Sequence, residues 1–281
     1  MTGEKRIDPI RALFPEELKE FIESHEEGSY TLLDVRQPFE YEEAHLPGAR
    51  LMPLPHLPDS LDEIDRKKPT IVYCRSGGRS QVAAQLLAHQ GFEDVQHLQG
   101  GINAWEEPTA EGPVDFHLSF VSGHESPSDV LRTAYRMEVG LKCFHEEVLA
   151  RTKEEDLAKV LQVLIKAEEK HMTTVRELAS TEGLNETQLA REIEESGPQL
   201  MEGGFNVSDF LKANERRLSS LTDFVELAMM LETQALDLYL RMAAESRNDR
   251  TRKVLLRISD EEKTHLGMLG RYLDEVFTPQ G

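Results

Sequence analysis

The feature that most constrains this chain is a pattern of carboxylates and histidines that occurs twice. In each copy a glutamate is followed 30 positions later by a Glu-x-x-His motif, and each member of the second copy lies 94 residues after its counterpart (232 against 138, for example). The six residues are Glu138, Glu168, His171, Glu232, Glu262 and His265. All six lie in long segments with helical periodicity. The pattern therefore predicts a two-fold internal repeat that builds one metal site in the middle of a four-helix bundle.

Each of these polar residues interrupts an otherwise apolar helix face, as Glu168 and His171 do between Leu164 and Val175. A lone buried carboxylate costs on the order of several kcal/mol unless it is paired or metal-bound, so four of them beside two histidines require a cation. Mixed carboxylate and imidazole ligation suits two iron ions, with manganese as an alternative, and calls for no organic cofactor. The competing interpretation, glutamates and histidines on solvated faces, does not explain the shared 94-residue offset.

A second candidate centre lies at Cys74, which ends the apolar run Thr-Ile-Val-Tyr-Cys and is followed by Arg-Ser-Gly-Gly-Arg-Ser and a helical segment. Loop amides and a helix N-terminus present partial positive charge to such a sulfur, which lowers its pKa and favours a bound anion. Arg75 and Arg79 add cationic donors, and Gly77 and Gly78 let the backbone curl around the site. The alternative is a buried structural cysteine before a turn.

At these residues the segment resembles the rhodanese homology domain, and the resemblance covers about residues 8–110. The resemblance implies a doubly wound parallel sheet and a cysteine, Cys74, that takes up sulfane sulfur as a persulfide and passes it to cyanide or a thiol. It also implies Arg79 as a second catalytic residue. Four residues separate Cys74 from Arg79, where related phosphatases have five, which favours sulfur over phosphate chemistry. The matching motifs are Asp34-Val35-Arg36, Glu40-Tyr41, Ala44-His45-Leu46-Pro47-Gly48-Ala49, Tyr73 to Ser80 and Gly100 to Trp105. The implied substrate-binding residues are Arg75, Ser76, Gly77, Gly78 and Ser80.

The repeated ligand pattern is similar to that of the ferritin-like di-iron carboxylate proteins, over about residues 126–277, and most like the rubrerythrin and bacterioferritin branch. The resemblance implies that the six repeated residues bind two irons that reduce peroxide or oxygen, or oxidise ferrous iron. Rubrerythrins carry a further glutamate where this chain has Ala235, so a symmetric, bacterioferritin-type site is expected. Tyr239 and His145 are each open to two interpretations: as hydrogen-bond partners of the ligands, or as a core tyrosine and an exposed histidine.

These patterns predict a rhodanese-like domain over 1–108, a linker over 109–126 and a ferritin-like di-iron domain over 127–277, that is, an α/β domain followed by an all-α four-helix bundle. In the first domain we expect a helix over 9–24 and another beginning at Ile102. The expected strands lie at 29–36, 70–74 and 94–101. In the second domain we expect long helices at 128–151, 154–180, 219–246 and 249–277, a polar crossover at 181–217 and a minor helix near 187–195.

Composition restricts the partners. The net charge of −20 excludes nucleic acid and anionic membranes as expected partners, and no stretch approaches the ~20 apolar residues of a membrane helix. Only two cysteines are present and no signal-type segment is seen at the N-terminus, so we expect a cytoplasmic protein. Without a Cys-x-x-Cys pair there is no rubredoxin module, which leaves the electron donor unknown. We expect a homodimer, because ferritin-like bundles often pair through helix faces.

Two functions follow. The first is a bifunctional enzyme: a persulfide sulfurtransferase that uses a small sulfur-containing donor and a thiol or cyanide acceptor, joined to a di-iron oxidoreductase. The second is a non-catalytic protein whose bundle binds or buffers iron and whose rhodanese domain carries sulfur or docks a partner. Consumption of peroxide with a supplied reductant distinguishes them.

Overall fold

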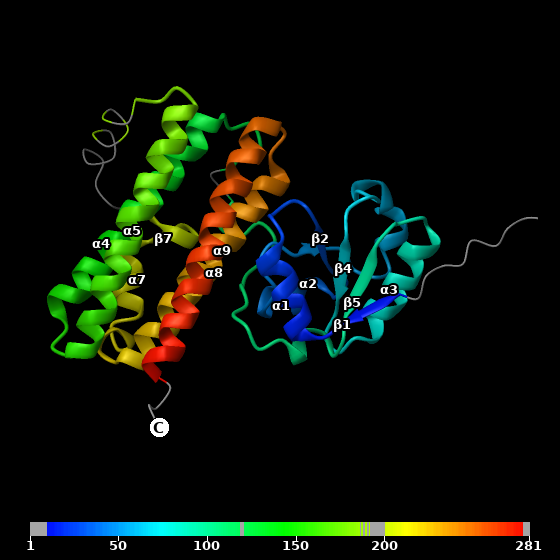
Figure 1. Cartoon of the computed structure of the whole chain (residues 1–281), viewed down its shortest axis with the longest axis horizontal. Helices are drawn as coiled ribbons and strands as arrows, with labels where there is room; N and C mark the ends of the chain where they lie inside the picture. Colours follow the sequence, from blue (N-terminus) through cyan, green and yellow to red (C-terminus); the bar gives the residue numbers. More distant parts are fainter. Residues whose placement is uncertain are drawn as a thin grey trace, which may run out of the picture. The chain divides into compact units, whose positions relative to one another are not determined.

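The computed structural model describes residues 10–118, 121–185, 187, 189, 191 and 200–277, with side chains as far as residue 271. The chain divides into two compact units, Met1–Val114 and Asp115–Gly281. In Figure 1 the first unit is coloured blue to cyan-green and the second green to red. The boundary falls inside the segment 109–126 that the sequence predicts as a linker.

The first unit is built on a five-stranded parallel sheet in the order β1-β5-β4-β2-β3. Every residue of the central strand β4 is buried, as expected for a parallel sheet covered on both faces. This confirms the parallel α/β sheet predicted for the N-terminal region. The strands are β1 (Arg11–Leu13), β2 (Thr31–Asp34), β3 (Arg50–Leu51), β4 (Thr70–Tyr73) and β5 (Val95–Leu98), and the helices are α1 (Pro15–Ser24), α2 (Pro38–Glu43) and α3 (Gly78–His89).

Two predicted helices of this unit are wrong in part. The segment 9–24 is not one helix: β1 occupies Arg11–Leu13, paired with the edge of β5, and α1 begins only at Pro15. Proline has no N–H to donate and suits the first turn of a helix, whereas the strand gains a partner that local periodicity cannot reveal. The helix expected from Ile102 is only the short turn η3 (Gly101–Ala104), because the chain is extended again at Trp105.

The second unit is mostly helical, as predicted. Its long helices are α4 (Pro127–Arg151), α5 (Glu155–Thr181), α8 (Leu221–Glu245) and α9 (Asp249–Phe277). Each end lies within two residues of its predicted position. Ser126 and Ser220 cap α4 and α8, each accepting a hydrogen bond from the backbone N–H three residues on. Within the described ranges, no helix is long and apolar enough to cross a membrane.

The crossover between α5 and α8 is more structured than the sequence suggests, although most of the minor helix predicted near 187–195 lies outside the described residues. A hairpin of two short strands follows, in which β6 (Leu200–Met201) pairs with β7 (Phe205–Asn206) across the turn η4 (Glu202–Gly204). The helix α7 (Val207–Ala213) and the turn η5 (Arg217–Ser219) complete it. Gly140 of α4 lies directly against the Leu200 carbonyl, so closely that a Cβ at residue 140 would overlap it. The hairpin is therefore packed into the helical unit.

Candidate functional site

Cys74 stands directly after β4, at the carboxyl edge of the sheet, and is buried. The Gly77 N–H donates a hydrogen bond to its Sγ over 3.2 Å, and the Ser80 hydroxyl lies 3.6 Å from the same sulfur. Burial raises the pKa of Cys74, but hydrogen bonds from Ser80 and from the backbone amides of Ser76 and Gly77 outweigh it, and the net pKa is lowered. The loop therefore stabilises a thiolate.

Glycines shape this loop where a side chain has no room. Gly77 has φ +97°, and a Cβ there would lie 3.3 Å from the Gly100 nitrogen. Gly101, with φ +64°, packs so closely on the Cys74 carbonyl and Arg75 that any Cβ would overlap them. The turns after β4 and β5 thus meet at the sulfur. Arg75, Ser76 and Gly78 are exposed around it, as binding residues must be, whereas Ser80 is buried beneath it.

Arg79 does not contact the sulfur in this structure. Its guanidinium donates two hydrogen bonds, of 2.7 and 2.6 Å, to the two carboxylate oxygens of Glu40. These bonds, against a smaller effect of burial, lower the pKa of Glu40 to about 2. The backbone amides and Ser80 supply the contacts to Cys74, and a contact between Arg79 and a substrate anion stays a prediction.

Three other residues of the rhodanese-like motifs, Asp34, Arg36 and His45, make contacts that hold the fold. Arg36 donates to both oxygens of Asp34 at 2.6 to 2.9 Å and to the Ala44 carbonyl at 2.6 Å, and both ionic side chains are buried. His45 hydrogen-bonds the Tyr41 carbonyl through Nδ1 at 2.8 Å and stacks on the Tyr41 ring. These contacts fix the segment between β2 and β3.

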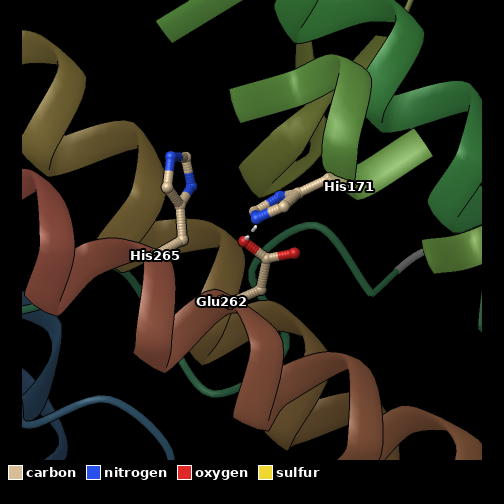
Figure 2. A group of neighbouring side chains, drawn as sticks. All are labelled: His171, Glu262 and His265. Atoms are coloured by element: carbon tan, nitrogen blue, oxygen red, sulfur yellow. Dashed lines mark ion pairs between the residues drawn. The ribbon is translucent and has the colours of Figure 1, made fainter. Parts of the chain in front are cut away.

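In the second unit the structure brings all six repeated residues together. Each is buried, from Glu168 at 0% exposure to His171 at 7%. Three sets offer ligand atoms within 4.8 Å of one another: His171–Glu262–His265, Glu138–Glu168–His171 and Glu168–Glu232–His265. Figure 2 shows the first set, with His171 reaching from α5 toward Glu262 and His265 on α9. Glu168 belongs to one set with each histidine, and Glu262 belongs to the set that contains both histidines.

Both histidines of the cluster place a ring nitrogen close to carboxylate oxygens. His171 Nδ1 lies 3.6 Å from Glu138 Oε2 and 3.8 Å from Glu262 Oε2, and His265 Nδ1 lies 3.2 Å from Glu232 Oε2. The two imidazole rings are 4.3 Å apart and nearly perpendicular. Both histidines thus direct a nitrogen into the carboxylates.

The carboxylates are short of donors. Among the described residues none hydrogen-bonds either oxygen of Glu138 or Glu168, or Oε2 of Glu232 or Glu262. Burial and then the charge of Glu232 raise the pKa of Glu138 to about 8, and burial with neighbouring carboxylates raises the pKa of Glu168 and Glu262 far above the usual range. Burial raises the pKa of Glu232 as well, but the attraction of His265 outweighs it and lowers the net value. A cation would satisfy these orphaned oxygens, so the residues fit a carboxylate-imidazole metal centre.

One residue of the cluster was not predicted. Glu202, in the turn η4 of the crossover, is fully buried, and a ligand atom of it lies within 4.8 Å of those of Glu138 and Glu262. The sequence pattern predicts only a polar crossover at 181–217. The signal available was a carboxylate followed by two glycines and flanked by the apolar residues Met201 and Phe205, which is unusual for a solvated loop.

His145 and Tyr239 also border the cluster, and they occupy equivalent places in the repeat, since 239 minus 145 is again 94. His145 is buried with its Nδ1 3.6 Å from Glu168 Oε1, and burial lowers its pKa to about 4, so the ring is neutral. The interpretation of His145 as exposed is therefore wrong. Tyr239 is buried with its hydroxyl 3.8 Å from the Met137 sulfur, and burial followed by the charge of Glu202 raises its pKa. The repeat is thus not symmetric outside its six ligands.

A small pocket lies beside the cluster between α5 and α9, with room for about one water-sized molecule. Glu138, His171 and Glu262 form its inner end, and apolar side chains line much of its wall. Its lining residues are Glu138, His171, Thr174, Val175, Leu178, Ile258, Glu261 and Glu262. Any approach to the cluster through this pocket is therefore narrow.

The first unit matches a known protein family. The rhodanese-like domain family matches residues 15–108. A thiosulfate sulfurtransferase, GlpE, from Pseudoalteromonas translucida is 33% identical over 90 residues, which is 32% of this chain and 86% of that protein. A sulfurtransferase from Allochromatium vinosum is 39% identical over 74 residues, 26% of this chain and 69% of that protein.

Other relatives are longer than the match. A probable adenylyltransferase/sulfurtransferase, MoeZ, from Mycobacterium tuberculosis is 37% identical over 93 residues, and the chain spans only 23% of its length. The chain spans 59% of the Bacillus subtilis protein YqhL. Among solved structures, a rhodanese-like domain protein from Staphylococcus aureus matches 36% of this chain and 98% of its own, at 25% identity and a TM-score of 0.34.

Proposed function

The chain belongs, through residues 15–108, to the rhodanese-like family, and on this premise we propose that its first unit is a sulfurtransferase with Cys74 as the nucleophile. The observation that supports this most directly is the Gly77 N–H aimed at Sγ, within a loop that lowers the pKa of the thiol. A thiolate is the reactive form of cysteine toward sulfur electrophiles.

The proposed reaction has two steps. The Cys74 thiolate attacks the outer sulfur of thiosulfate, the sulfur–sulfur bond of the donor breaks, and sulfite leaves with the bonding electron pair. Cyanide or a thiolate then attacks the outer sulfur of the Cys74 persulfide, which gives thiocyanate or a new persulfide and regenerates the thiolate. The amides of the 75–80 loop stabilise the anionic sulfur in both steps, because several N–H dipoles converge on one point.

The test is Cys74→Ser in the full chain, assayed for thiocyanate formation from thiosulfate and cyanide. Transfer should fall to background, since a serine hydroxyl is not ionised at neutral pH and cannot hold sulfane sulfur. Cys143→Ser is the matched control, because Cys143 is the chain's other cysteine and lies in α4 of the second unit. It should keep full activity. Undiminished transfer by Cys74→Ser would exclude the assignment.

For the second unit we propose a ferritin-like di-iron carboxylate site with oxidoreductase activity. The supporting observation is the convergence of the six repeated residues, with buried carboxylate oxygens that no donor satisfies. One metal position would be held by Glu138 and His171, the other by Glu232 and His265, with Glu168 and Glu262 between them. Bound iron would supply one-electron chemistry toward peroxide, oxygen or ferrous iron.

The chain's own contribution to such chemistry is positioning and exclusion. The buried helix faces keep bulk water from the ligands, and the pocket between α5 and α9 limits access to small molecules. The neutral ring of His145 lies beside Glu168 without adding positive charge to the site.

Metal analysis of the chain purified without oxygen tests this proposal, with two irons per chain as the expected result. The double variant Glu168→Gln, Glu262→Gln should bind none, because both positions lose their shared ligands. Reductant-dependent peroxide consumption by the wild type would support the oxidoreductase. Iron uptake without turnover would instead support the alternative function of metal buffering.

A further inference from the structure

We propose that Glu202 is a seventh protein ligand of the metal centre, delivered by the crossover, and that it makes the two metal positions unequal. This inference rests on the proposed di-metal function. It assigns a role to a segment that lies outside the 94-residue repeat and that sequence periodicity treats as a connection.

The Glu202 carboxylate occupies a position that suits a metal ligand. The side chain is fully buried, and neither oxygen accepts a hydrogen bond from the described part of the chain. One of its oxygens forms a group with those of Glu138 and Glu262, all within 4.8 Å. A solvated loop would leave a glutamate free to reach water. Here a carboxylate is aimed into a cluster that already holds four others of its kind, which is costly without a cation.

The hairpin that carries Glu202 is held in place by close packing against the rest of the helical unit. Gly140 lets the Leu200 carbonyl lie against α4, where a Cβ would overlap it. Gly203 has φ +71° and packs against Phe205 and Gln234, with a hypothetical Cβ at 2.7 and 3.0 Å from them. Three separate contacts thus hold the hairpin, the third being from His117, which hydrogen-bonds the Gly203 carbonyl through Nδ1. Such packing fixes the direction of the Glu202 side chain.

Glu202 has no counterpart in the 94-residue repeat. Residue 108, which lies 94 positions earlier, is a proline in the first unit. The position held by Glu138 and His171 therefore gains a carboxylate that the position held by Glu232 and His265 lacks. Carboxylate oxygens are hard ligands, so the position beside Glu202 should bind a hard cation such as Mn²⁺ more tightly and fill first.

The experiment is a titration of the metal-free full chain with Mn²⁺ without oxygen, following free Mn²⁺ by its electron paramagnetic resonance signal. The wild type should bind two ions in two separable steps. In Glu202→Gln the Mn²⁺ affinity of the first step should fall by at least about 10-fold. Loss of a residue that only hydrogen-bonds a metal ligand already lowers metal affinity by about 10-fold or more, so loss of a ligand should cost at least as much. The second step should change by less than about threefold. Glu169→Gln, an exposed charge removal beside Glu168, is the matched control and should titrate as the wild type does.

The outcomes separate the two proposals. A wild type that binds no Mn²⁺ and no Fe²⁺ removes the proposed metal function and this inference with it. A wild type that binds two ions, beside a Glu202→Gln protein that binds both with unchanged affinity, overturns the inference alone. That result would make Glu202 a protonated side chain that shares a proton with Glu138. An equal loss at both steps would overturn the inequality of the positions.

A second variant protects the test against misfolding. Glu202→Asp keeps the carboxylate but shortens it by one methylene, and far-UV circular dichroism checks the helices of each protein before titration. If Glu202→Gln does not fold, Glu202→Asp decides the test: a lower Mn²⁺ affinity in its first step, with the second step unchanged, supports the inference. An unchanged titration of Glu202→Asp in that case contradicts it.

Discussion

The two units differ in whether their buried carboxylates are paired with a donor. In the α/β unit the buried carboxylate Asp34 is matched by Arg36, with every contact between 2.6 and 2.9 Å. In the helical unit five buried carboxylates surround two histidines, and many of their oxygens have no donor. The first arrangement is complete as the chain folds, and its role is structural. In the second, several buried oxygens have no donor among the described residues, so the arrangement is incomplete, and the proposed metal would satisfy these oxygens.

The largest effect should come from breaking the complete arrangement. Asp34→Asn leaves the Arg36 guanidinium buried without its counter-charge, which should cost about 3–5 kcal/mol of unfolding free energy. Trp105, the chain's one tryptophan, lies in the same unit, so its fluorescence during urea denaturation reports on that unit. Asp62→Asn, which removes an exposed partner of Arg66, is the control and should change little. An unchanged denaturation midpoint for Asp34→Asn would contradict the interpretation.

Metal binding to the carboxylate-histidine cluster should raise the stability of the helical unit by nearly as much. Metal that binds the folded helical unit stabilises it by about 4 kcal/mol when free metal is about 1,000 times its Kd. Thermal melting followed by far-UV circular dichroism, with and without Mn²⁺, measures the gain. The Glu168→Gln, Glu262→Gln protein should show no gain, and an equal gain there would indicate that the metal binds elsewhere.

The metal-free helical unit should lose stability as pH rises. The folded pKa of Glu138 is about 8 against 4.5 for the free side chain, because burial and Glu232 oppose its ionisation. The native state therefore keeps a proton that the unfolded chain releases. The contribution of protonated Glu138 to the free energy of unfolding is complete below pH 4.5 and is lost as pH rises through 8. Between pH 6 and pH 8 the loss should be on the order of 2 kcal/mol. Urea denaturation of metal-free wild type and Glu138→Gln at both pH values measures it, and an equal fall in both would contradict this cause.

The smallest effect should come from the partly exposed pair at the rim of the sulfur loop. Glu40→Gln removes the partner of Arg79 and should cost about 0.5–1 kcal/mol at neutral pH. The folded pKa of Glu40, about 2, lies below its ordinary 4.5, so the wild type should lose this contribution as pH falls from 4.5 toward 2. The two proteins should thus converge in stability in acid. Tryptophan fluorescence at both pH values tests this, and a constant difference would contradict it.

Local patterns were sufficient for the long elements. The helices that carry the six repeated ligands are 25 to 29 residues long, and their apolar faces specify them over many turns. The buried strands β4 and β5 and the Cys74 loop were likewise visible, because β-branched runs and paired glycines mark them. The six predicted ligands converge as their spacing suggests, since equal offsets in paired helices place residues at one depth.

The remainder depends on contacts between distant segments. The strand Arg11–Leu13 exists because the edge of β5 is available to pair with it, and nothing in those three residues records this. Arg79 turns to Glu40, 39 residues earlier, and so leaves the sulfur to the loop amides. Glu202 reaches the cluster only because a hairpin of two-residue strands packs on Gly140. Such short elements have too few residues to show a period.

The contact between Gly140 and the Leu200 carbonyl also bears on the order of folding. The helix pairs α4–α5 and α8–α9 close through connections of three residues each, 152–154 and 246–248, so their contacts are local and form quickly. The hairpin that carries Glu202 packs on α4, sixty residues earlier in the chain, and on α8, so its contacts span longer stretches of sequence. Because non-local contacts close larger loops, we expect the hairpin to dock later than the helix pairs form, and Glu202 to reach the cluster with it.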